Sequence, residues 1–349
     1  MQAAIYSINN GITIGNIQVI DNKNVQLNLS NKLTFQIKYT VTVTGAFDCV
    51  GNVIGSNNTA IFALPEQGFA GDLIINEVLF NPYTGGADFV EIYNNSNKFI
   101  DLQNWNLANL ENDSIDNYKV LTDNPKLILP GEFVLLTKDG QAVENDYINS
   151  VTDAFLQMAS LSTYSNDEGE VFLINNLNMV VDSFYYTDDM HFALLNTEDG
   201  VSLERIDYDR PSNDETNWHS AAEDAGFATP GFENSQYMQT NSDGGEIVVS
   251  PLTFSPDNDG MDDVVNISYN FPTPGFVASI IIYDSKGRLI RNLIQNELLG
   301  ISGTFSWDGI NEDAEKARIG IYIIFVEAFD IDGNVKSFKK TVVLAGRLE

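Results

Sequence analysis

The sequence predicts an all-β protein built from tandem immunoglobulin-like β-sandwiches. In many short segments apolar and polar residues alternate with a period of two, and Gly, Asn and Asp separate these segments as turn residues. Stretches with the 3.6-residue period of an amphipathic helix are scarce. The chain has 349 residues, which is too long for one ordinary sandwich and suits two or three domains.

We expect strands where this alternation is clearest. They are residues 25–29, 35–37, 39–43, 264–269, 276–283 and 336–344. Many short strands with turns between them are typical of sandwiches. Lys339 and Lys340 suit the last of these strands to an edge of its sheet, because exposed lysines discourage pairing with other chains.

Two segments interrupt the pattern and divide the chain into three expected units. At residues 64–68 a proline ends one strand before a new apolar run begins at Leu73. Residues 238–245 are polar and end in Ser-Asp-Gly-Gly, which is typical of a flexible tether. We therefore expect units at residues 1–68, 71–237 and 245–346, arranged end to end.

Charge and cysteine content restrict the partners. Lys and Arg number 18 against 49 Asp and Glu, so the net charge is -31. Such a surface repels nucleic-acid phosphates and anionic lipids, and it favours hard cations such as calcium. Cys49 is the only cysteine, so neither an intrachain disulfide nor a cysteine zinc cluster can form. The negative surface also predicts that the protein has no nucleic-acid partner. No apolar run approaches the roughly 18–20 residues of a membrane span, so we expect no direct membrane insertion.

The motifs of the common enzyme classes do not occur in the sequence. His191 and His219 are the only histidines, and neither accompanies a Gly-x-Ser-x-Gly elbow. There is also no His-Glu-x-x-His, Gly-x-x-x-x-Gly-Lys or Gly-x-Gly-x-x-Gly. A glycosidase-type carboxylate pair stays formally open, but no spacing selects one. We expect a non-enzymatic protein without catalytic or cofactor-binding residues, in which His191 packs or forms a hydrogen bond.

One acidic segment is a candidate metal site. Asp257, Asp259 and Asp263 occupy positions one, three and seven around Gly260, as in the first half of an EF-type calcium loop. Position twelve is Ser268 rather than the bidentate glutamate of that loop. Two interpretations therefore stay open: a calcium site, or an acidic turn whose carboxylates accept hydrogen bonds from backbone amides.

The middle of the chain carries a distinctive series of motifs. They are residues 75–82 (INEVLFNP), 85–96 (GGADFVEIYNNS), 100–105 (IDLQNW), 130–135 (PGEFVL), 165–169 (SNDEG), 181–186 (VDSFYY), 200–205 (GVSLER), 217–218 (NW) and 229–231 (TPG). In this order the series resembles the lamin tail domain as it occurs in Bacteroidetes-type proteins, over residues 71–237. The resemblance implies an immunoglobulin-like scaffold that serves recognition or spacing rather than chemistry.

Several residues of these motifs have expected structural roles. Phe89, Val90 and Ile92 are expected to fill the core of a strand. Glu91 and Asn94 are expected to point the other way or to cap the turn at Ser96. Trp105 and Trp218 are expected core residues. For the pair Glu204 and Arg205 two interpretations stay open, an internal ion pair or a solvated face.

The two ends of the chain carry weaker resemblances. Residues 254–263 (FSPDNDGMDD), 281–291 (IIYDSKGRLIR), 307–309 (WDG) and 320–323 (GIYI) are similar to the immunoglobulin-like domain of flagellar-hook-capping proteins and to type IX secretion C-terminal domains. In these motifs Asp284 and Asp308 are expected to accept backbone hydrogen bonds, while Gly287 and Gly309 supply positive φ angles. Residues 39–52 resemble the closing strands of a bacterial immunoglobulin-like domain, with Asp48 and Asn52 flanking a turn at Gly51.

These observations favour a structural or adhesive module of a secreted or cell-surface protein of a Gram-negative bacterium, acting as a spacer, anchor or interaction scaffold. The first residues lack the basic and apolar regions of a signal peptide, so we expect the chain to be a piece of a longer protein. The expected partner is a protein or a cell-surface glycan. The alternatives are an extracellular glycan-binding module, for which Tyr185, Tyr186 and Tyr208 are candidate residues, and an accessory region of a larger secreted hydrolase.

Overall fold

A computed structural model confirms the all-β fold class and describes residues 4–21, 23–48, 50–238 and 246–346. Cys49, most of the predicted tether and residues 348–349 therefore lie outside the described residues. Strands dominate the described part of the chain, and its single α-helix is α1 (Gly140–Asp146). None of the described helices is long and apolar enough to cross a membrane.

The N-terminal unit consists of two small sheets. The first has the order β1-β4-β5, and the second is the hairpin β2-β3. Their bounds are β1 (Ile5–Ile8), β2 (Ile14–Val19), β3 (Val25–Leu29), β4 (Tyr39–Thr44) and β5 (Thr59–Phe62). Tyr39 is buried and stacks on Phe62, with ring centroids 5.5 Å apart. As predicted, Asp48 closes its turn by accepting hydrogen bonds from the backbone N–H (2.8 Å) and side-chain amide (2.7 Å) of Asn52.

The predicted strand at residues 35–37 is wrong. These residues form a turn in which Gln36 has a φ of 59°, a left-handed conformation that a strand does not accommodate. The turn brings the backbone N–H of Thr34 within 2.9 Å of the Tyr39 hydroxyl, so a tertiary hydrogen bond overrides the local alternation.

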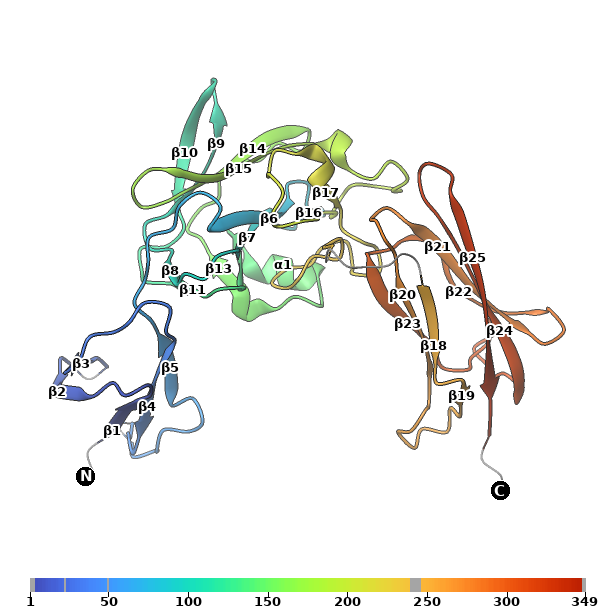
Figure 1. The fold of residues 1–349 in the computed structure, drawn as a ribbon, viewed down its shortest axis with the longest axis horizontal. Helices are drawn as coiled ribbons and strands as arrows, with labels where there is room; N and C mark the ends of the chain where they lie inside the picture. The colour runs from blue at the N-terminus through green and yellow to red at the C-terminus, as the bar shows by residue number, and fades with distance from the viewer. Residues whose placement is uncertain (1–3, 22, 49, 239–245, 347–349) are drawn as a thin grey trace.

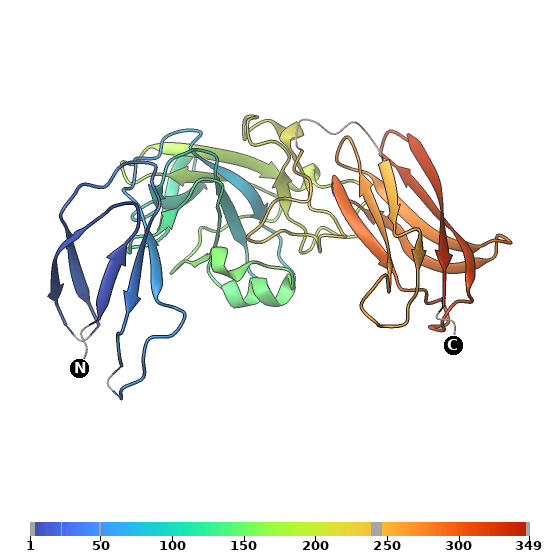
Figure 2. The ribbon, with the colours of Figure 1, turned by 60° about the horizontal axis from the view of Figure 1, so that its bottom comes forward.

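The central unit packs two sheets face to face, and a third, small sheet β11-β8 lies beside them. The larger sheet has the order β13-β12-β7-β6-β16-β17, and the other has the order β10-β9-β14-β15. Their bounds are β6 (Leu73–Leu79), β7 (Phe89–Asn94), β8 (Ile100–Asp101), β9 (Asn106–Glu111), β10 (Ser114–Val120), β11 (Leu127–Ile128), β12 (Phe133–Thr137), β13 (Phe155–Gln157), β14 (Glu168–Ile174), β15 (Val180–Thr187), β16 (Leu203–Arg205) and β17 (Trp218–Ser220). Short 3-10 turns η1 (Thr152–Ala154), η2 (Asp188–Met190) and η3 (Glu215–Asn217) join some of these strands, and α1 lies at one end of the larger sheet (Figure 2).

The core of the central unit contains both tryptophans that the sequence predicted to be buried. Trp105 lies between the sheets, and its ring is so close to Gly68 that a Cβ there would sit 2.7 Å from it. Trp218 stacks on Phe184 at 3.6 Å, and its indole N–H donates to the carbonyl of Ser212 at 2.7 Å. Asn94 caps the turn by accepting from the backbone N–H of Ser96 at 3.1 Å, as expected.

The C-terminal unit is a second sandwich with its own core. Its sheets have the orders β18-β20-β23 and β19-β25-β24-β21-β22. Their bounds are β18 (Glu246–Ser250), β19 (Thr253–Phe254), β20 (Val265–Asn270), β21 (Val277–Asp284), β22 (Leu289–Leu298), β23 (Ser302–Trp307), β24 (Gly320–Phe329) and β25 (Val335–Leu344). The turn predictions for Asp284 and Asp308 are confirmed, since both accept backbone N–H groups two residues further on, at 2.9 and 3.0 Å. Gly287 and Gly309 both have a φ of 78°.

The three units form an arch in which the N-terminal and C-terminal units descend from either side of the central unit (Figure 1). The contact between the central and C-terminal units combines hydrogen bonds with apolar packing. The backbone N–H of Ile301 donates to Ser235 and that of Glu223 donates to Leu298, both at 2.9 Å. Beside them, Phe192 of the central unit packs on Val277 and Leu298 of the C-terminal unit.

Candidate functional site

The three aspartates of the predicted calcium site do come together. One carboxylate oxygen of each of Asp257, Asp259 and Asp263 lies within 4.8 Å of the others, in the loop between β19 and β20. The loop reaches this shape because Asn258, Gly260 and Asp262 take left-handed φ angles of 62°, 86° and 52°. The sequence therefore predicted the cluster correctly as a set of neighbouring carboxylates.

Each of these carboxylates also accepts a backbone hydrogen bond, as the turn interpretation expects. The carboxylate of Asp263 accepts from the N–H groups of Asn258 (2.6 Å) and Gly260 (2.8 Å). Asp259 accepts from Met261 at 2.9 Å. Ser268, at position twelve, lies in β20, where its hydroxyl pairs with that of Thr304 at 2.9 Å and so takes no part in the loop.

A second acidic group lies in the interior of the central unit. Glu77 of β6, Glu91 of β7 and Glu204 of β16 are all fully buried. They lie beneath residues 227–236, a segment that crosses over the larger sheet and supplies hydrogen-bond donors. Thr229 donates its backbone N–H to Glu77 at 2.9 Å, and Gly231 donates to Glu91 at 2.6 Å.

Hydrogen-bond geometry favours a protonated carboxyl in this network. The Thr229 hydroxyl lies 3.1 Å from Glu77 and 2.8 Å from Glu204, yet it has a single proton to donate. A proton on one of these two carboxyls supplies the second hydrogen bond. Burial, followed by the neighbouring charge of Glu204, raises the pKa of Glu77 to about 8. Burial also raises the pKa values of Glu91 and Glu204.

The structure differs from both interpretations of Glu204 and Arg205. Both side chains are buried, so the solvated face is wrong. Arg205 does form an internal ion pair, but its partner is Asp182 of β15, at 3.2 Å, rather than Glu204. The reason is alternation along β16, which sends these adjacent side chains to opposite faces of the sheet. Arg205 also packs over the ring of Trp218.

His191 has the packing role that the sequence predicted. Its Nδ1 lies 2.9 Å from the hydroxyl of Ser220, and its ring packs against Phe80. Burial lowers the pKa of His191 to about 4, so the ring is neutral near pH 7. The same Ser220 hydroxyl accepts the backbone N–H of Phe192 at 2.9 Å and thereby fixes the loop that reaches the C-terminal unit.

The three candidate tyrosines for glycan binding do not share a surface. Tyr185 is 41% exposed and donates to Glu168 at 2.7 Å, whereas Tyr186 is fully buried against Phe80. Tyr208 belongs instead to a row of four half-buried rings, which we call the aromatic stack. It consists of Phe133, Tyr93, Tyr208 and Tyr237, whose successive ring centroids lie 4.8, 4.2 and 4.2 Å apart.

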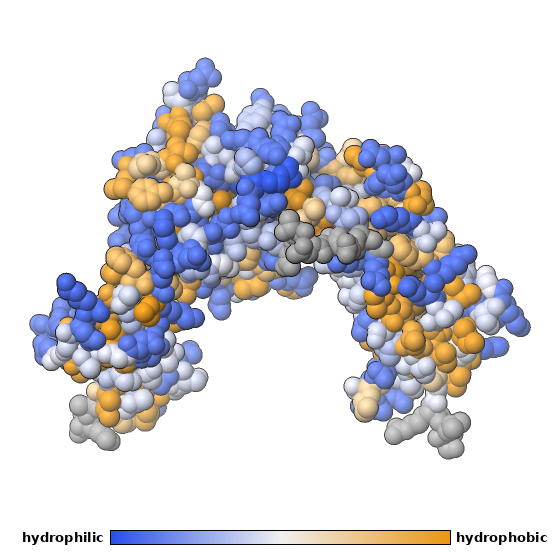
Figure 3. All heavy atoms as spheres, viewed as in Figure 1, coloured by the Kyte–Doolittle hydropathy of each residue, from blue (hydrophilic) through white to orange (hydrophobic). Residues whose placement is uncertain are grey.

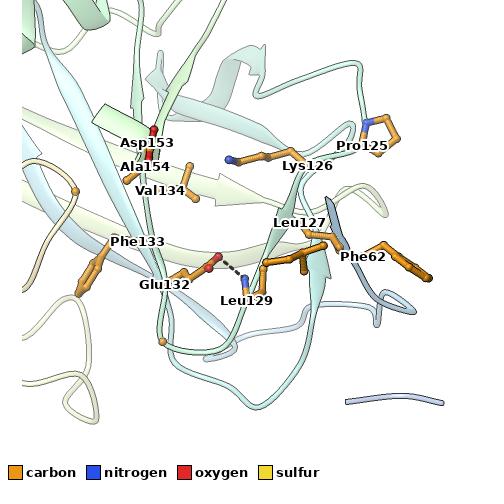
Figure 4. Close-up of a pocket in the computed structure, with 13 residues that line it drawn as sticks. Phe62, Pro125, Lys126, Leu127, Leu129, Glu132, Phe133, Val134, Asp153 and Ala154 are labelled. Carbon is orange, nitrogen blue, oxygen red and sulfur yellow. Dashed lines mark hydrogen bonds between the residues drawn. The ribbon is translucent and has the colours of Figure 1, made fainter. Parts of the chain in front are cut away.

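A hollow of about 720 Å³ has Phe133 among its lining residues, and the ring of Phe133 points away from the other labelled side chains (Figure 4). Ile61 and Phe62 of β5 contribute to its wall, together with residues of the central unit that include Phe133. Lys126, Glu132 and Asp153 also line it, and Glu132 closes a turn by accepting from the backbone N–H of Leu129 at 2.9 Å. The hollow therefore combines apolar walls with a few charged groups, a composition typical of ligand-binding pockets.

Sequence reasoning missed the buried glutamates and the aromatic stack. Glu91 does point to the face of the sheet opposite Val90. Residues 227–236 cover this second face, so Glu91 is buried as well. One signal was available, since Asn76 and Glu77 interrupt an otherwise apolar strand and therefore need buried partners. The stack left no such signal, because its central contact joins Tyr93 and Tyr208, which are more than 100 residues apart in the sequence.

The fold defines an all-β protein of tandem immunoglobulin-like sandwiches. Residues 67–188 of its central unit match the family described as "Lamin Tail Domain", which confirms the resemblance carried by the motifs in that stretch. The structural unit continues beyond the match, because β16 and β17 complete the larger sheet by pairing with β6 and with each other.

Three solved structures are similar to the chain. FlgD from P. aeruginosa is 20% identical over 30% of this chain and 78% of its own, with a TM-score of 0.22. PorZ from Porphyromonas gingivalis, a surface component of the type IX secretion system, is 12% identical over 95% of this chain and 39% of its own (TM-score 0.24). PorU from the same organism is 9% identical over 99% and 30% (TM-score 0.24), so the chain spans well under two thirds of both Porphyromonas proteins. No curated protein matches the sequence.

The buried glutamates predict that the central unit loses stability as pH rises from 7 to 9. An unfolded glutamate ionises near 4.5, whereas Glu77 keeps its proton until about pH 8, so this contribution is complete below pH 4.5 and is lost as pH passes 8. We expect a loss of about 1–2 kcal/mol. His191 does not interfere, because it is neutral in both states above pH 7.

Urea unfolding followed by tryptophan fluorescence measures this loss. In a Trp307→Phe background the remaining tryptophans, Trp105 and Trp218, both report on the central unit. Glu77→Gln imitates the protonated side chain and should reduce the dependence on pH. A stability that is constant or rises between pH 7 and 9 contradicts the prediction.

Proposed function

We propose that the chain is a non-enzymatic structural or adhesive module of a secreted or cell-surface bacterial protein, in which the lamin tail domain and its neighbours act as a spacer, anchor or interaction scaffold. In this proposal the units are residues 1–68, 71–237 and 245–346, and the protein resides outside a Gram-negative cell. The lamin tail domain supports a scaffold role, and the largely hydrophilic visible face of the central unit suits exposure to solvent (Figure 3).

The observation that carries the proposal is the junction between the central and C-terminal units. A spacer transmits position only if its units keep a fixed angle, and this junction has both polar and apolar restraints. The Asp224 carboxylate accepts from the backbone N–H of Gly300 at 3.3 Å and from the hydroxyl of Tyr269. Gln236 reaches across to the carbonyl of Leu299 at 3.4 Å. These bonds surround the apolar contact of Phe192 with Leu298.

We expect the two units to keep one relative orientation in solution, and small-angle X-ray scattering of the full chain tests this. The double variant Asp224→Ala/Leu298→Ala removes one polar and one apolar restraint and should broaden the distribution of interatomic distances. Leu289→Ala is the matched control, because Leu289 lies at the other end of β22 and is 50% exposed. Scattering from the unaltered chain as broad as that of the double variant would refute the rigid spacer.

The aromatic stack favours a second candidate function, the binding of an extracellular glycan. Sugars bind proteins through aromatic rings that cover their apolar faces, together with polar groups that fix orientation. Within the described residues, Phe133 and Tyr237 at the two ends of the stack have an aromatic neighbour on one side only. A glycan would therefore contact the stack at its ends.

A glycan array distinguishes this candidate from the spacer. Glycan binding predicts saturable hits that Tyr237→Ala abolishes, because the change removes the terminal ring. Tyr185→Ala, which removes an exposed tyrosine elsewhere in the same unit, should leave them intact. An array without hits, or equal losses in both variants, excludes the stack as a glycan site.

We further propose that the aspartate cluster binds calcium, with Asp257, Asp259 and Asp263 as ligands. The convergence of their carboxylates supports this, since Ca²⁺ prefers carboxylate oxygens. Isothermal titration of the full chain with millimolar calcium should give heat, and calcium should raise the melting temperature of the C-terminal unit.

Asp259→Asn removes one charged ligand and should weaken the calcium affinity at least about tenfold, which corresponds to about 1.4 kcal/mol. Asp332→Asn is the control, because it lies in the exposed turn between β24 and β25. No heat and no melting shift would leave the cluster as a turn only.

A further inference from the structure

Acidic residues are distributed unevenly along this chain. Residues 66–245 contain 32 Asp and Glu but only six Lys and Arg. Residues 1–65 contain three lysines and two aspartates. The C-terminal unit carries eight Lys and Arg beside 14 Asp and Glu between residues 246 and 346. Basic residues are therefore most numerous in the C-terminal unit, although this unit as a whole is negatively charged.

Four of these eight basic residues line one hollow of about 520 Å³. Lys286 and Arg288 come from the turn between β21 and β22, and Lys316 and Arg318 come from the segment that leads into β24. Asp284 and Glu315 are the only acidic residues in the wall. The hollow lies at the end of the five-stranded sheet opposite the junction, because Val277 and Leu298 of the same two strands contact the central unit at the other end.

The negative charge of Asp284 is balanced by Arg288, and its carboxylate also fixes the turn. The carboxylate of Asp284 accepts from the backbone N–H groups of Lys286 and Arg288, both at 2.9 Å. It also pairs with the Arg288 guanidinium at 2.6 Å. These hydrogen bonds, that of the Arg288 backbone foremost, lower the pKa of Asp284 and keep it charged. Arg288 is thereby held at the wall of the hollow.

The other three basic residues have no acidic partner in the described part of the chain. Neither Lys286, Lys316 nor Arg318 forms an ion pair there. The ammonium group of Lys316 donates to the carbonyl of Pro256 at 2.9 Å, which positions it without cancelling its charge. Glu315 is the single acid left to oppose them, so the hollow keeps a positive balance. The acidic central unit does not cancel this field, since charges are screened over about 8 Å at physiological salt.

We propose that this hollow binds an oxyanion group, a phosphate or a sulfate, carried by a saccharide. Guanidinium and ammonium groups arriving from two segments suit a tetrahedral oxyanion, because they reach it from different sides. The volume exceeds that of a single ion and falls within the range of about 300–1,000 Å³ typical of organic ligands. Ser285 and Asn311 in the wall add the polar groups that hydrogen-bond sugar hydroxyls.

This site is separate from the aromatic stack and does not depend on the spacer role. Scattering tests whether the units keep a fixed orientation, and titration tests whether the hollow binds a ligand. Either proposal can therefore fail without the other.

Calorimetric titration of the full chain with three probes tests the site. The probes are a sulfated tetrasaccharide, its desulfated counterpart and inorganic phosphate, each at physiological ionic strength. We expect the sulfated probe to bind and the desulfated one not to. The variant Lys286→Gln/Arg318→Gln should weaken binding at least about tenfold, since each tenfold corresponds to about 1.4 kcal/mol. Added salt should weaken it as well.

The matched control is Lys32→Gln/Lys38→Gln. It changes the net charge of the chain equally, at two exposed lysines of the N-terminal unit. We expect its affinity to stay within about twofold of the unaltered chain. Circular dichroism of both variants verifies that the fold is retained.

The outcomes separate two sources of the anion. Binding of both the sulfated probe and phosphate shows that the oxyanion itself is recognised, and binding of the sulfated probe alone shows that the sugar contributes as well. Binding of phosphate alone overturns the saccharide. Failure of both anions to bind, or an equal loss in the control variant, overturns the site.

Discussion

Three buried glutamates tie residues 227–236 to the larger sheet of the central unit, and much of the remaining architecture depends on that attachment. Glu77 and Glu91 receive donors from Thr229 and Gly231, and Glu204 receives the backbone N–H of Gln236 at 2.9 Å. Burying carboxyl groups is costly unless they are protonated or fully hydrogen-bonded. Here both conditions contribute, so a polar network can occupy the interior and hold a segment that has no regular secondary structure.

The same segment carries contacts to the C-terminal unit, so the glutamates act beyond their own domain. Ser235 donates its hydroxyl to Glu204 at 2.7 Å, while its carbonyl accepts the backbone N–H of Ile301 at 2.9 Å. One residue therefore connects the interior of the central unit to the neighbouring sandwich. A change that displaces residues 227–236 is expected to disturb the junction as well, because both attachments lie on one short stretch of backbone.

Acidic, aromatic and basic surface residues gather in different parts of the chain. Acidic residues are numerous in the central unit, the aromatic stack includes Tyr93 of β7 and Phe133 of β12, and the basic hollow lies at the distant end of the C-terminal unit. A scaffold gains from this arrangement, because net negative charge keeps it soluble while local patches of other character supply specific contacts. The arch seen in Figure 1 places the units that bear these surfaces apart from one another.

The sequence by itself determined the fold class, most strands, the turns at Asp48, Asp284 and Asp308, and the meeting of the three aspartates around Gly260. Each of these depends on alternation or on hydrogen bonds between residues a few positions apart. Only the tertiary structure decided that Glu91 would be buried on its second face and that Arg205 would choose Asp182. Those partners are decided by packing, and the contact of Glu91 with Gly231 spans 140 positions of chain. Local patterns carry no information about such a distance, which is also why the basic hollow appeared only once two separate segments were brought together.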